Sequence, residues 1–412
     1  MTGLLQLWLR GEHLGELEQL RTGRLRLRYS TEALDTYGVG ARPLSLSLPL
    51  TDRRVQGDVL ERFLDNLLPE GAVRAALERE NGIRPGDTFA LLTVVGRECA
   101  GAVQLTADDA APGPGRLIPL TDAEAGALVS GLPSLEPPEG QVVSASLGGM
   151  QAKVLLTRTS EGWAWPAEGA LSTHIIKPEP VNDIVLPELV RWEEWALRLA
   201  RGAGVPAAHA ELADFDGRTA IVVERFDRVG GERVHQEDFA QALGISARDK
   251  YESSATGHTR LLAIAQDAAA EAVVPSSLVV DELTQVAFNL VVGNGDAHSK
   301  NYSLAISPTA SYSMTPMYDV APVYLLNSIY QHFGHVVDGQ ARLRHLTGAH
   351  LGREAERWGL PAGRARDVIA DVAERVRAAV GSCAGQGIDV ERVAEEVAAR
   401  AGGVLDALVG DG

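Results

Sequence analysis

Asn294-Gly295-Asp296-Ala297-His298-Ser299-Lys300-Asn301, followed by Tyr318-Asp319, is the most informative stretch of this chain. An asparagine stands five residues after Asp296, and a second aspartate stands eighteen residues after that asparagine. This spacing is typical of a phosphoryl-transfer site: the first aspartate accepts or orients the proton of the attacking hydroxyl, and the other two side chains hold magnesium ions at the ATP phosphates. Aspartate and asparagine are common in loops, so the pattern needs support from the rest of the chain.

The residues around Asp296 favour a rigid loop. The apolar run 290–292 precedes it, and Gly293 and Gly295 allow the chain to turn sharply between packed elements. A catalytic loop is usually built on such a base. The alternative is an ordinary turn that ends a helix.

Two further side chains extend this hypothesis. Asp319 follows the largely apolar segment 314–318, which would fix a metal-binding carboxylate beside the loop, although it also fits a turn after a strand. Lys300 could neutralise the phosphoryl group in transfer. His298 is interpreted as a donor that stabilises the loop rather than as a proton relay.

Two segments upstream could contact phosphates. Lys177 ends the apolar strand 174–177, where it would either reach ATP or remain solvated, and the solvated alternative is favoured in isolation. The turn 146–153 contains Gly148 and Gly149, which let backbone N–H groups approach phosphates. By pattern alone this turn also fits a plain β-hairpin.

The connector Val223-Glu224-Arg225-Phe226-Asp227-Arg228 joins a sheet-rich block to a helical block, where adenine is normally bound, or it is a structural strand with a surface salt bridge. Glu194 could pair with Lys177, as a helix glutamate does in protein kinases. A solvated helix face is the favoured interpretation, because Arg191 and Arg198 flank Glu194 at i−3 and i+4.

Composition excludes several classes of protein. The chain of 412 residues has 38 basic and 55 acidic side chains, a net charge of −17, which argues against a broad surface for nucleic acid or anionic membrane. A local phosphate pocket and a basic partner remain compatible with this charge. Cys99 and Cys383 form no disulfide framework. There is no signal-peptide pattern and no apolar run of membrane-spanning length, so we expect a cytoplasmic protein.

The order of predicted elements indicates an α+β, bilobal fold resembling protein kinases. A β-rich subdomain is expected over residues 1–110, a Gly-bearing sheet lobe over 116–235 and a helical lobe over 236–412, with a Pro/Gly linker between the first two. Strands are predicted at 5–9, 25–29, 44–48, 154–156, 174–177 and 221–226, and strand-like and turn-like sequence at 89–104. Helices are predicted at 61–80 with a break near 69–71, and at 187–201, 237–243, 259–272, 277–292, 367–380 and 389–409.

Taken in order, these segments resemble the HipA family of serine/threonine kinases, the toxins of HipBA-type toxin–antitoxin modules. The resemblance covers nearly the whole chain. The segments that carry it are Pro43-Leu44-Ser45-Leu46-Ser47-Leu48-Pro49-Leu50, residues 63–71, Gly101-Ala102-Val103-Gln104, residues 146–153, 173–177 and 223–228, Gln236-Glu237-Asp238-Phe239, residues 293–301, and Tyr318-Asp319-Val320.

The resemblance implies a role for each matching residue. It implies that Asp296 is the catalytic aspartate and that Asn301 and Asp319 bind magnesium. The residues implied to bind ATP are Lys177, Ser146, Gly148, Gly149, Lys153, Glu224, Phe226 and Lys300, with Glu224 and Phe226 at the adenine. Ser146 matches the loop serine that family members autophosphorylate. About two negative charges there would repel the triphosphate, so phosphorylation is expected to be self-inhibitory.

The resemblance also implies partners. These are a small helix-turn-helix antitoxin of the HipB kind, DNA only through that antitoxin, and a protein substrate, for which an aminoacyl-tRNA synthetase is one candidate. No membrane partner is expected. The family often has a Gly-Gly-Lys-like turn after the second aspartate, whereas this chain has Asp338-Gly339-Gln340, a departure that bears on substrate contacts rather than on the chemistry.

Two other functions fit the same residues. The chain could be a catalytically weak kinase-like scaffold that acts as a co-repressor with a DNA-binding antitoxin. It could also be a small-molecule kinase on a related, lipid-kinase-like fold. Against the scaffold, the set Asp296, Asn301, Asp319 and Lys177 is complete.

Overall fold

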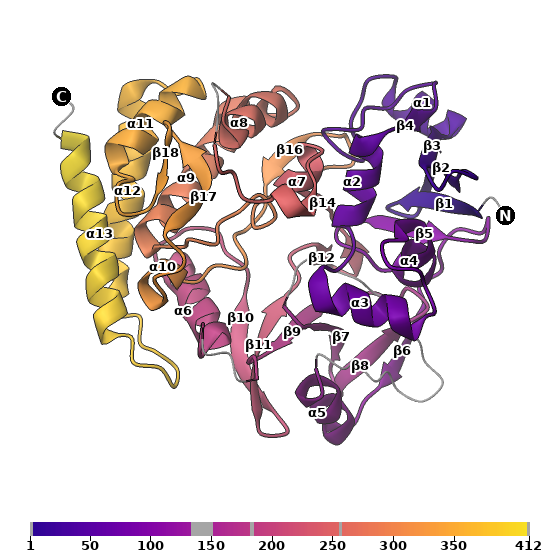
Figure 1. Ribbon diagram of the computed structural model, residues 1–412, viewed down its shortest axis with the longest axis horizontal. Coiled ribbons are helices and arrows are strands. Elements are labelled where there is room, and N and C mark those ends of the chain that lie inside the picture. The colour runs from indigo at the N-terminus through magenta and orange to yellow at the C-terminus, as the bar shows by residue number, and fades with distance from the viewer. Residues whose placement is uncertain (1–2, 133–150, 182–184, 255–257, 410–412) are drawn as a thin grey trace. The chain divides into compact units, whose positions relative to one another are not determined.

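The structure is a computed structural model that describes residues 3–132, 151–181, 185–254 and 258–409 (Figure 1). The chain divides into two compact units, each built from several stretches. The first comprises Met1–Pro178, Ala213–Ala247 and Ala305–Ser311, and the second comprises Glu179–Leu212, Arg248–Leu304 and Tyr312–Gly412.

The first unit begins with a five-stranded sheet of order β4-β3-β2-β1-β5. Its strands are β1 Gly3–Leu9, β2 Glu12–Gln19, β3 Leu25–Tyr29, β4 Val55–Gln56 and β5 Val103–Thr106. The helices around it are α1 Thr31–Tyr37, α2 Asp58–Asn66, α3 Gly71–Glu80 and α4 Thr88–Val95. The alternating leucines of β1 and β3 enter one buried core with α2 and α4, and the predicted break between two helices near residue 69 is confirmed.

Two predictions in this region were wrong. Residues 44–48 form turns instead of a strand, although Leu44, Leu46 and Leu48 are buried. Their polar groups bond to side chains or to other segments: the Leu46 N–H donates to the Glu237 carboxylate at 2.8 Å, and the Ser47 hydroxyl donates to the Gln241 carbonyl at 2.8 Å. Within the segment, the Ser45 hydroxyl accepts from the Ser47 N–H at 3.2 Å, and a local serine bond of this kind competes with strand pairing.

The second error concerns residues 89–104, which begin with a helix. The Asp87 carboxylate accepts a hydrogen bond from the Ala90 N–H at 3.0 Å and caps α4. The apolar run of α4 is buried, so its sequence looks the same as that of a buried strand.

The second sheet of this unit has the order β10-β11-β9-β7-β8-β6. Its strands are β6 Arg116–Pro119, β7 Val154–Thr159, β8 Gly162–Ala167, β9 His174–Pro178, β10 Ala210–Phe215 and β11 Arg218–Glu224, with α5 Asp122–Ser130 packed against it. The unit continues through β12 Arg228–Val229, β13 Glu232–Arg233, β14 His235–Asp238 and α7 Phe239–Ala242. The predicted strands at 154–156, 174–177 and 221–226 are confirmed, except that β11 ends at Glu224.

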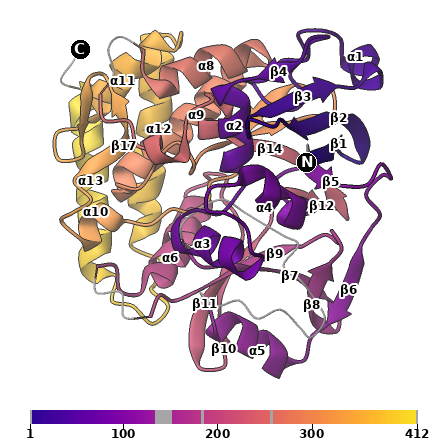
Figure 2. The ribbon, with the colours of Figure 1, turned by 45° about the vertical axis from the view of Figure 1, so that its right-hand side comes forward.

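The second unit is mostly helical. Its helices are α6 Leu189–Gly202, η1 Ala247–Asp249 at its boundary, α8 Arg260–Ala270, α9 Pro275–Val292, α10 Val323–Leu326, α11 Gly348–Arg357, α12 Ala362–Val380 and α13 Glu391–Val409. Its strands are β16 Tyr312–Met314, β17 His332–Val337 and β18 Gln340–Arg342, and β15 Ser303–Ile306 begins in it. Helix α9 packs against α8, α12 and α13 (Figures 1 and 2). The predicted helices are confirmed to within a few residues, and α10 and α11 were not predicted. In the described ranges, no helix is long and apolar enough to span a membrane.

Helix α9 carries a buried carboxylate, Glu282, whose side chain is fully inaccessible. Neither of its oxygens has a hydrogen-bond partner among the described residues. Burial, and then the negative charge of Glu354, raise the pKa of Glu282 well above its ordinary value. The folded chain therefore holds a proton that the unfolded chain releases, and stability is expected to fall as the pH rises above the unfolded pKa.

We expect Glu282→Gln to remove this pH dependence. Between pH 5 and pH 8 the wild type should lose more unfolding free energy than the variant, by on the order of 1–3 kcal/mol, because only the wild type must keep an acid neutral or bury its charge. Urea midpoints measured at both pH values test this. Glu395→Gln, at an exposed position of α13, is the matched control, and equal pH slopes for all three proteins would contradict the prediction.

Candidate functional site

The loop predicted to be catalytic begins where α9 ends. Gly293 closes the helix with a φ of 75°, a left-handed conformation that favours glycine. The Arg400 guanidinium donates to the carbonyls of Leu290 at 2.6 Å and Val291 at 3.2 Å, and it lies 5.2 Å from the ring centroid of Tyr324. The end of the helix is thus capped by a charged side chain from α13, and the loop starts from a fixed point.

A chain of hydrogen bonds between buried side chains fixes the loop. The Asn294 Oδ1 accepts from the Asp296 N–H at 3.1 Å, and the Asn294 Nδ2 donates to the Asn289 Oδ1 at 2.9 Å. The Asn289 Nδ2 in turn donates to the Tyr302 hydroxyl at 2.9 Å. Asn289 and Tyr302 were missed in the sequence. The available signal was an asparagine inside the apolar run of α9, because a buried amide must find partners.

Asp296 projects from this loop and is only partly buried, with 38% of its side-chain surface exposed. The Tyr251 hydroxyl donates to its Oδ1, and the Asn301 Nδ2 donates to its backbone carbonyl at 2.9 Å. Burial raises the pKa of Asp296 to about 6. The Asp319 carboxylate acts in the same direction, and Tyr251 and Lys250 act against it. A carboxylate with a pKa near neutrality suits proton transfer.

Asp319 adopts a φ of 54°, the left-handed region that is uncommon for residues other than glycine. The segment before it is held on both sides. The Met317 N–H donates to the Pro206 carbonyl at 2.9 Å, and the Met317 carbonyl accepts from the Ala208 N–H at 2.8 Å. The Tyr318 hydroxyl donates to the carbonyl of Lys300 at 2.9 Å. This last bond ties the Asp319 segment to the loop that carries Asp296.

The structure therefore brings Asp296, Asn301 and Asp319 together within the second unit. Carboxylate and amide oxygens are the ligands that Mg²⁺ prefers. The Asn301 Nδ2 is used on the backbone of the loop, which leaves the Oδ1 as the oxygen ligand of that amide. The residues present fit magnesium, because a divalent cation would relieve the repulsion that Asp319 exerts on Asp296.

His298 and Lys300 are buried in the same loop. The His298 Nδ1 accepts from the Lys300 N–H at 3.3 Å, so this ring nitrogen is an acceptor, not the expected donor. Burial, helped by Lys250, lowers the pKa of His298 to about 3, and the ring is neutral. The loop also packs against Gly334 of β17, where a Cβ would lie 2.2 Å from the Ala297 carbonyl oxygen.

The remaining predicted residues that the structure describes lie in the first unit. Lys177 is only 5% exposed and stands opposite Ile221 in the pairing of β9 with β11, so the favoured reading of a solvated lysine was wrong. Glu224 is exposed at the end of β11, and Phe226 and Lys153 are half-buried. A lysine is rarely buried unless its charge is paired.

Three predicted residues, Ser146, Gly148 and Gly149, lie outside the described residues. The expectation for Glu194 was half right. It pairs with Arg198 at 2.8 Å, as predicted, but it is 1% exposed and does not belong to a solvated helix face.

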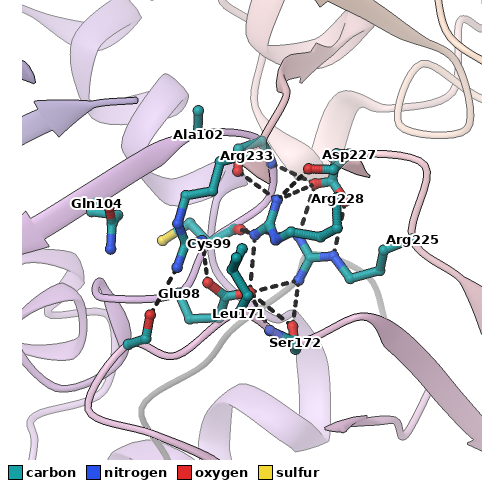
Figure 3. A network of polar contacts seen from close by, with 12 residues as sticks. Glu98, Cys99, Ala102, Gln104, Leu171, Ser172, Arg225, Asp227, Arg228 and Arg233 are labelled. Atoms are coloured by element: carbon teal, nitrogen blue, oxygen red, sulfur yellow. Dashed lines mark hydrogen bonds and ion pairs between the residues drawn. The ribbon is translucent and has the colours of Figure 1, made fainter. Parts of the chain in front are cut away.

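The connector 223–228 contains a buried cluster of charges that the sequence did not reveal (Figure 3). Arg225 donates to both carboxylate oxygens of Asp227, at 2.9 and 2.8 Å, and to the Glu98 Oε1 at 3.2 Å. Arg228 donates to the same Glu98 oxygen at 2.9 Å, and Arg233 pairs with the other one. The surface salt bridge expected here is a buried network instead.

The network joins the connector to the N-terminal part of the first unit. Asp227 accepts from the Gly101 N–H at 2.7 Å, and Arg225 and Arg228 both donate to the Cys99 carbonyl, at 3.1 and 2.9 Å. Burial acts to raise the pKa of Glu98, but the three arginines outweigh it and the pKa is lowered. Glu224 and Phe226 are thus flanked by anchored residues.

Comparison with known proteins gives consistent matches. The model of the HipA N-terminal domain matches residues 5–106, and that of the HipA-like C-terminal domain matches residues 145–380. The serine/threonine-protein kinase toxin HipA of Shewanella oneidensis is 31% identical over 359 residues, 82% of this chain and 80% of that protein. The solved complex of HipA, HipB and operator DNA from Shewanella oneidensis MR-1 contains a similar chain, with a TM-score of 0.78 and 28% identity over 98% of this chain and 96% of that one. The predicted α+β, HipA-like fold is confirmed.

Proposed function

Since the chain belongs to the HipA family of serine/threonine kinases, we propose that it transfers the terminal phosphoryl group of ATP to serine or threonine hydroxyls of a protein. The observation that supports this most strongly is the convergence of Asp296, Asn301 and Asp319 on one loop fixed by buried hydrogen bonds. A scaffold without catalysis would have no need of two carboxylates held in mutual repulsion.

In the proposed mechanism, Asp296 accepts or orients the proton of the attacking hydroxyl. Asn301 and Asp319 would hold the magnesium ions, which would supply positive charge to offset the negative charge that develops on the phosphates. Lys300 adds a positive charge at the loop, and the neutral His298 stabilises the loop by accepting a hydrogen bond from the Lys300 N–H.

Several residues of the first unit are proposed to bind ATP, as the resemblance implies. Lys177 is assigned to the phosphates, and Glu224 and Phe226 to adenine. Gly148, Gly149 and Lys153 are assigned to phosphate binding. Ser146 is the proposed site of self-inhibitory autophosphorylation.

We further propose that the chain is the toxin of a toxin–antitoxin module in the cytoplasm. A small, HipB-like helix-turn-helix antitoxin would bind it and would make most of the contact with DNA. The similar chain in the solved HipA, HipB and operator DNA complex supports this partner, and the net charge of −17 is compatible with a basic one. An aminoacyl-tRNA synthetase is the proposed class of protein substrate.

One experiment tests both transfer and self-inhibition. The purified chain is incubated with [γ-³²P]ATP, with or without Mg²⁺, and phosphate is located by mass spectrometry. We expect incorporation only with Mg²⁺, with phosphate at Ser146 and a progressive loss of ATP binding as Ser146 is modified. Incorporation without any phosphate at Ser146 would remove the self-inhibition proposal alone. No transfer to the chain, to casein or to aminoacyl-tRNA synthetases would contradict the kinase proposal.

A further inference from the structure

Tyr251 makes a contact with the loop that none of the predicted roles explains. Its hydroxyl donates to the Oδ1 of Asp296, the carboxylate proposed to receive the proton of the acceptor. Its ring stands edge-on to His298, with 4.9 Å between centroids and 90° between planes. The residue is nonetheless 45% exposed. An exposed phenol thus makes the hydrogen bond that a substrate hydroxyl must make.

The backbone on both sides of Tyr251 is held firmly. The Lys250 carbonyl accepts from the Ser299 N–H at 3.1 Å and from Arg260 at 3.1 Å. On the other side, the Glu252 N–H donates to the Gly334 carbonyl at 2.9 Å, and its carboxylate accepts from the Val336 and Arg260 N–H groups at 3.0 Å each. The main chain at Tyr251 is therefore fixed, whereas its side chain, at the surface, can leave by rotating about χ1.

The Tyr251 hydroxyl takes one of the lone-pair directions of the Asp296 Oδ1. A serine or threonine hydroxyl that approaches along the same direction can bond to this oxygen only after the Tyr251 hydroxyl has released it. Hydrogen bonds to an ionised group are stronger than those between neutral groups, so this release has an appreciable cost.

We propose that Tyr251 is a positioning residue that occupies the place of the acceptor hydroxyl at Asp296 and thereby controls which acceptors reach it. This inference rests on the proposed kinase function and adds a determinant of acceptor specificity to it. A protein acceptor must bring enough contacts to displace the tyrosine. Water, which brings none, competes poorly with the tyrosine for this direction at the Oδ1 of Asp296, and hydrolysis of ATP through this oxygen is slowed.

Tyr251→Phe tests this proposal, because it removes the hydroxyl and keeps the ring against His298. The vacated volume is about that of one water molecule, which can then bond to Asp296. In the hydrolysis of ATP, the water oxygen forms a bond to the terminal phosphorus, the bond from that phosphorus to the bridging oxygen of ADP breaks, and the water proton passes to Asp296. We expect hydrolysis without a protein acceptor to rise about tenfold, and the KM for dephosphorylated casein to fall about tenfold, with the KM for ATP and the kcat for casein unchanged.

Tyr29→Phe is the matched control, since it removes a tyrosine hydroxyl that bonds to the Leu48 carbonyl in the first unit. It should leave all of these constants unchanged. A merely structural role for Tyr251 would change kcat and thermal stability together in the Tyr251→Phe variant. Either that result, or an unchanged rate of hydrolysis with an unchanged KM for casein, would overturn the inference. The kinase function would remain intact in both cases. If wild type and Tyr251→Phe both fail to transfer or hydrolyse Mg-ATP, the proposed function fails, and the inference fails with it.

Discussion

Replacing Asp296 by asparagine is expected to lower the rate of phosphoryl transfer from ATP by about 10²- to 10⁴-fold, the usual contribution of a positioned proton acceptor. Asparagine keeps the size of the side chain and an oxygen that can accept from Tyr251. The bond from Asn301 goes to the backbone carbonyl of residue 296, so the substitution leaves it in place. The loss should therefore appear in kcat, with folding and ATP affinity little changed.

The measurement is transfer of phosphate from [γ-³²P]ATP to casein under steady-state conditions. Asp249→Asn, an exposed aspartate on a nearby segment of the same unit, is the matched control for the loss of one negative charge and should retain wild-type activity. Transfer by Asp296→Asn at the wild-type rate would remove Asp296 from the proposed catalytic role and leave the fold and family unaffected.

The sequence was sufficient to locate the loop 294–301, but not the distant residues that contact it and the end of the helix before it. The spacing of Asp296, Asn301 and Asp319 can be recognised in the sequence because these residues lie within one short segment of the chain. Tyr251 and Arg400 come from segments far away in the chain, and Arg400 lies beyond residue 380, where the family match ends. No local pattern marks a residue whose partner is brought close only by tertiary packing.

Helices were predicted better than the short elements around them. The 3.6-residue periodicity of α8, α9 and α12 is long enough to be distinctive. By contrast, α4 is defined by an Asp87 cap before a uniformly apolar run, and segment 44–48 is defined by hydrogen bonds to Glu237 and Gln241. In both places hydrogen bonds of side chains hold the conformation, and the pattern of alternating or continuous hydrophobicity does not reveal them.

The solvent exposure of several charged side chains was also predicted wrongly. Glu194 was expected on a solvated helix face, and a solvated position was favoured for Lys177 when its strand was considered in isolation, but both side chains are buried. The cost of burying a charge depends on its partners, and the sequence does not show all of them. The same holds for the connector 223–228, where a surface salt bridge was one of two alternatives and where Arg225 and Asp227 are instead enclosed with Glu98.

Glu98→Gln is expected to destabilise the first unit by about 3–5 kcal/mol, the usual result of removing one partner from a buried ion pair. In the wild type, Glu98 and Asp227 face three arginines, Arg225, Arg228 and Arg233. The variant would leave the three cations with Asp227 alone, in a site where Arg225, Arg228 and Glu98 side chains are at most 2% exposed. The hydrogen bond from Ser172 to Glu98 at 2.8 Å can persist with glutamine, so the loss is mainly one of charge.

Denaturant unfolding at neutral pH measures this loss, and Asp108→Asn is the control because it breaks the exposed pair between Arg97 and Asp108, worth at most about 1 kcal/mol. The pH dependence adds a second test. The pKa of Glu98 is lowered in the folded chain, so its contribution is present above the ordinary value of 4.5 and is lost as the pH falls through the folded pKa. The difference in unfolding free energy between the wild type and Glu98→Gln should therefore become smaller at acid pH. If Glu98→Gln loses no more unfolding free energy than Asp108→Asn does, the buried arginines do not need the charge of Glu98 for the stability of the fold.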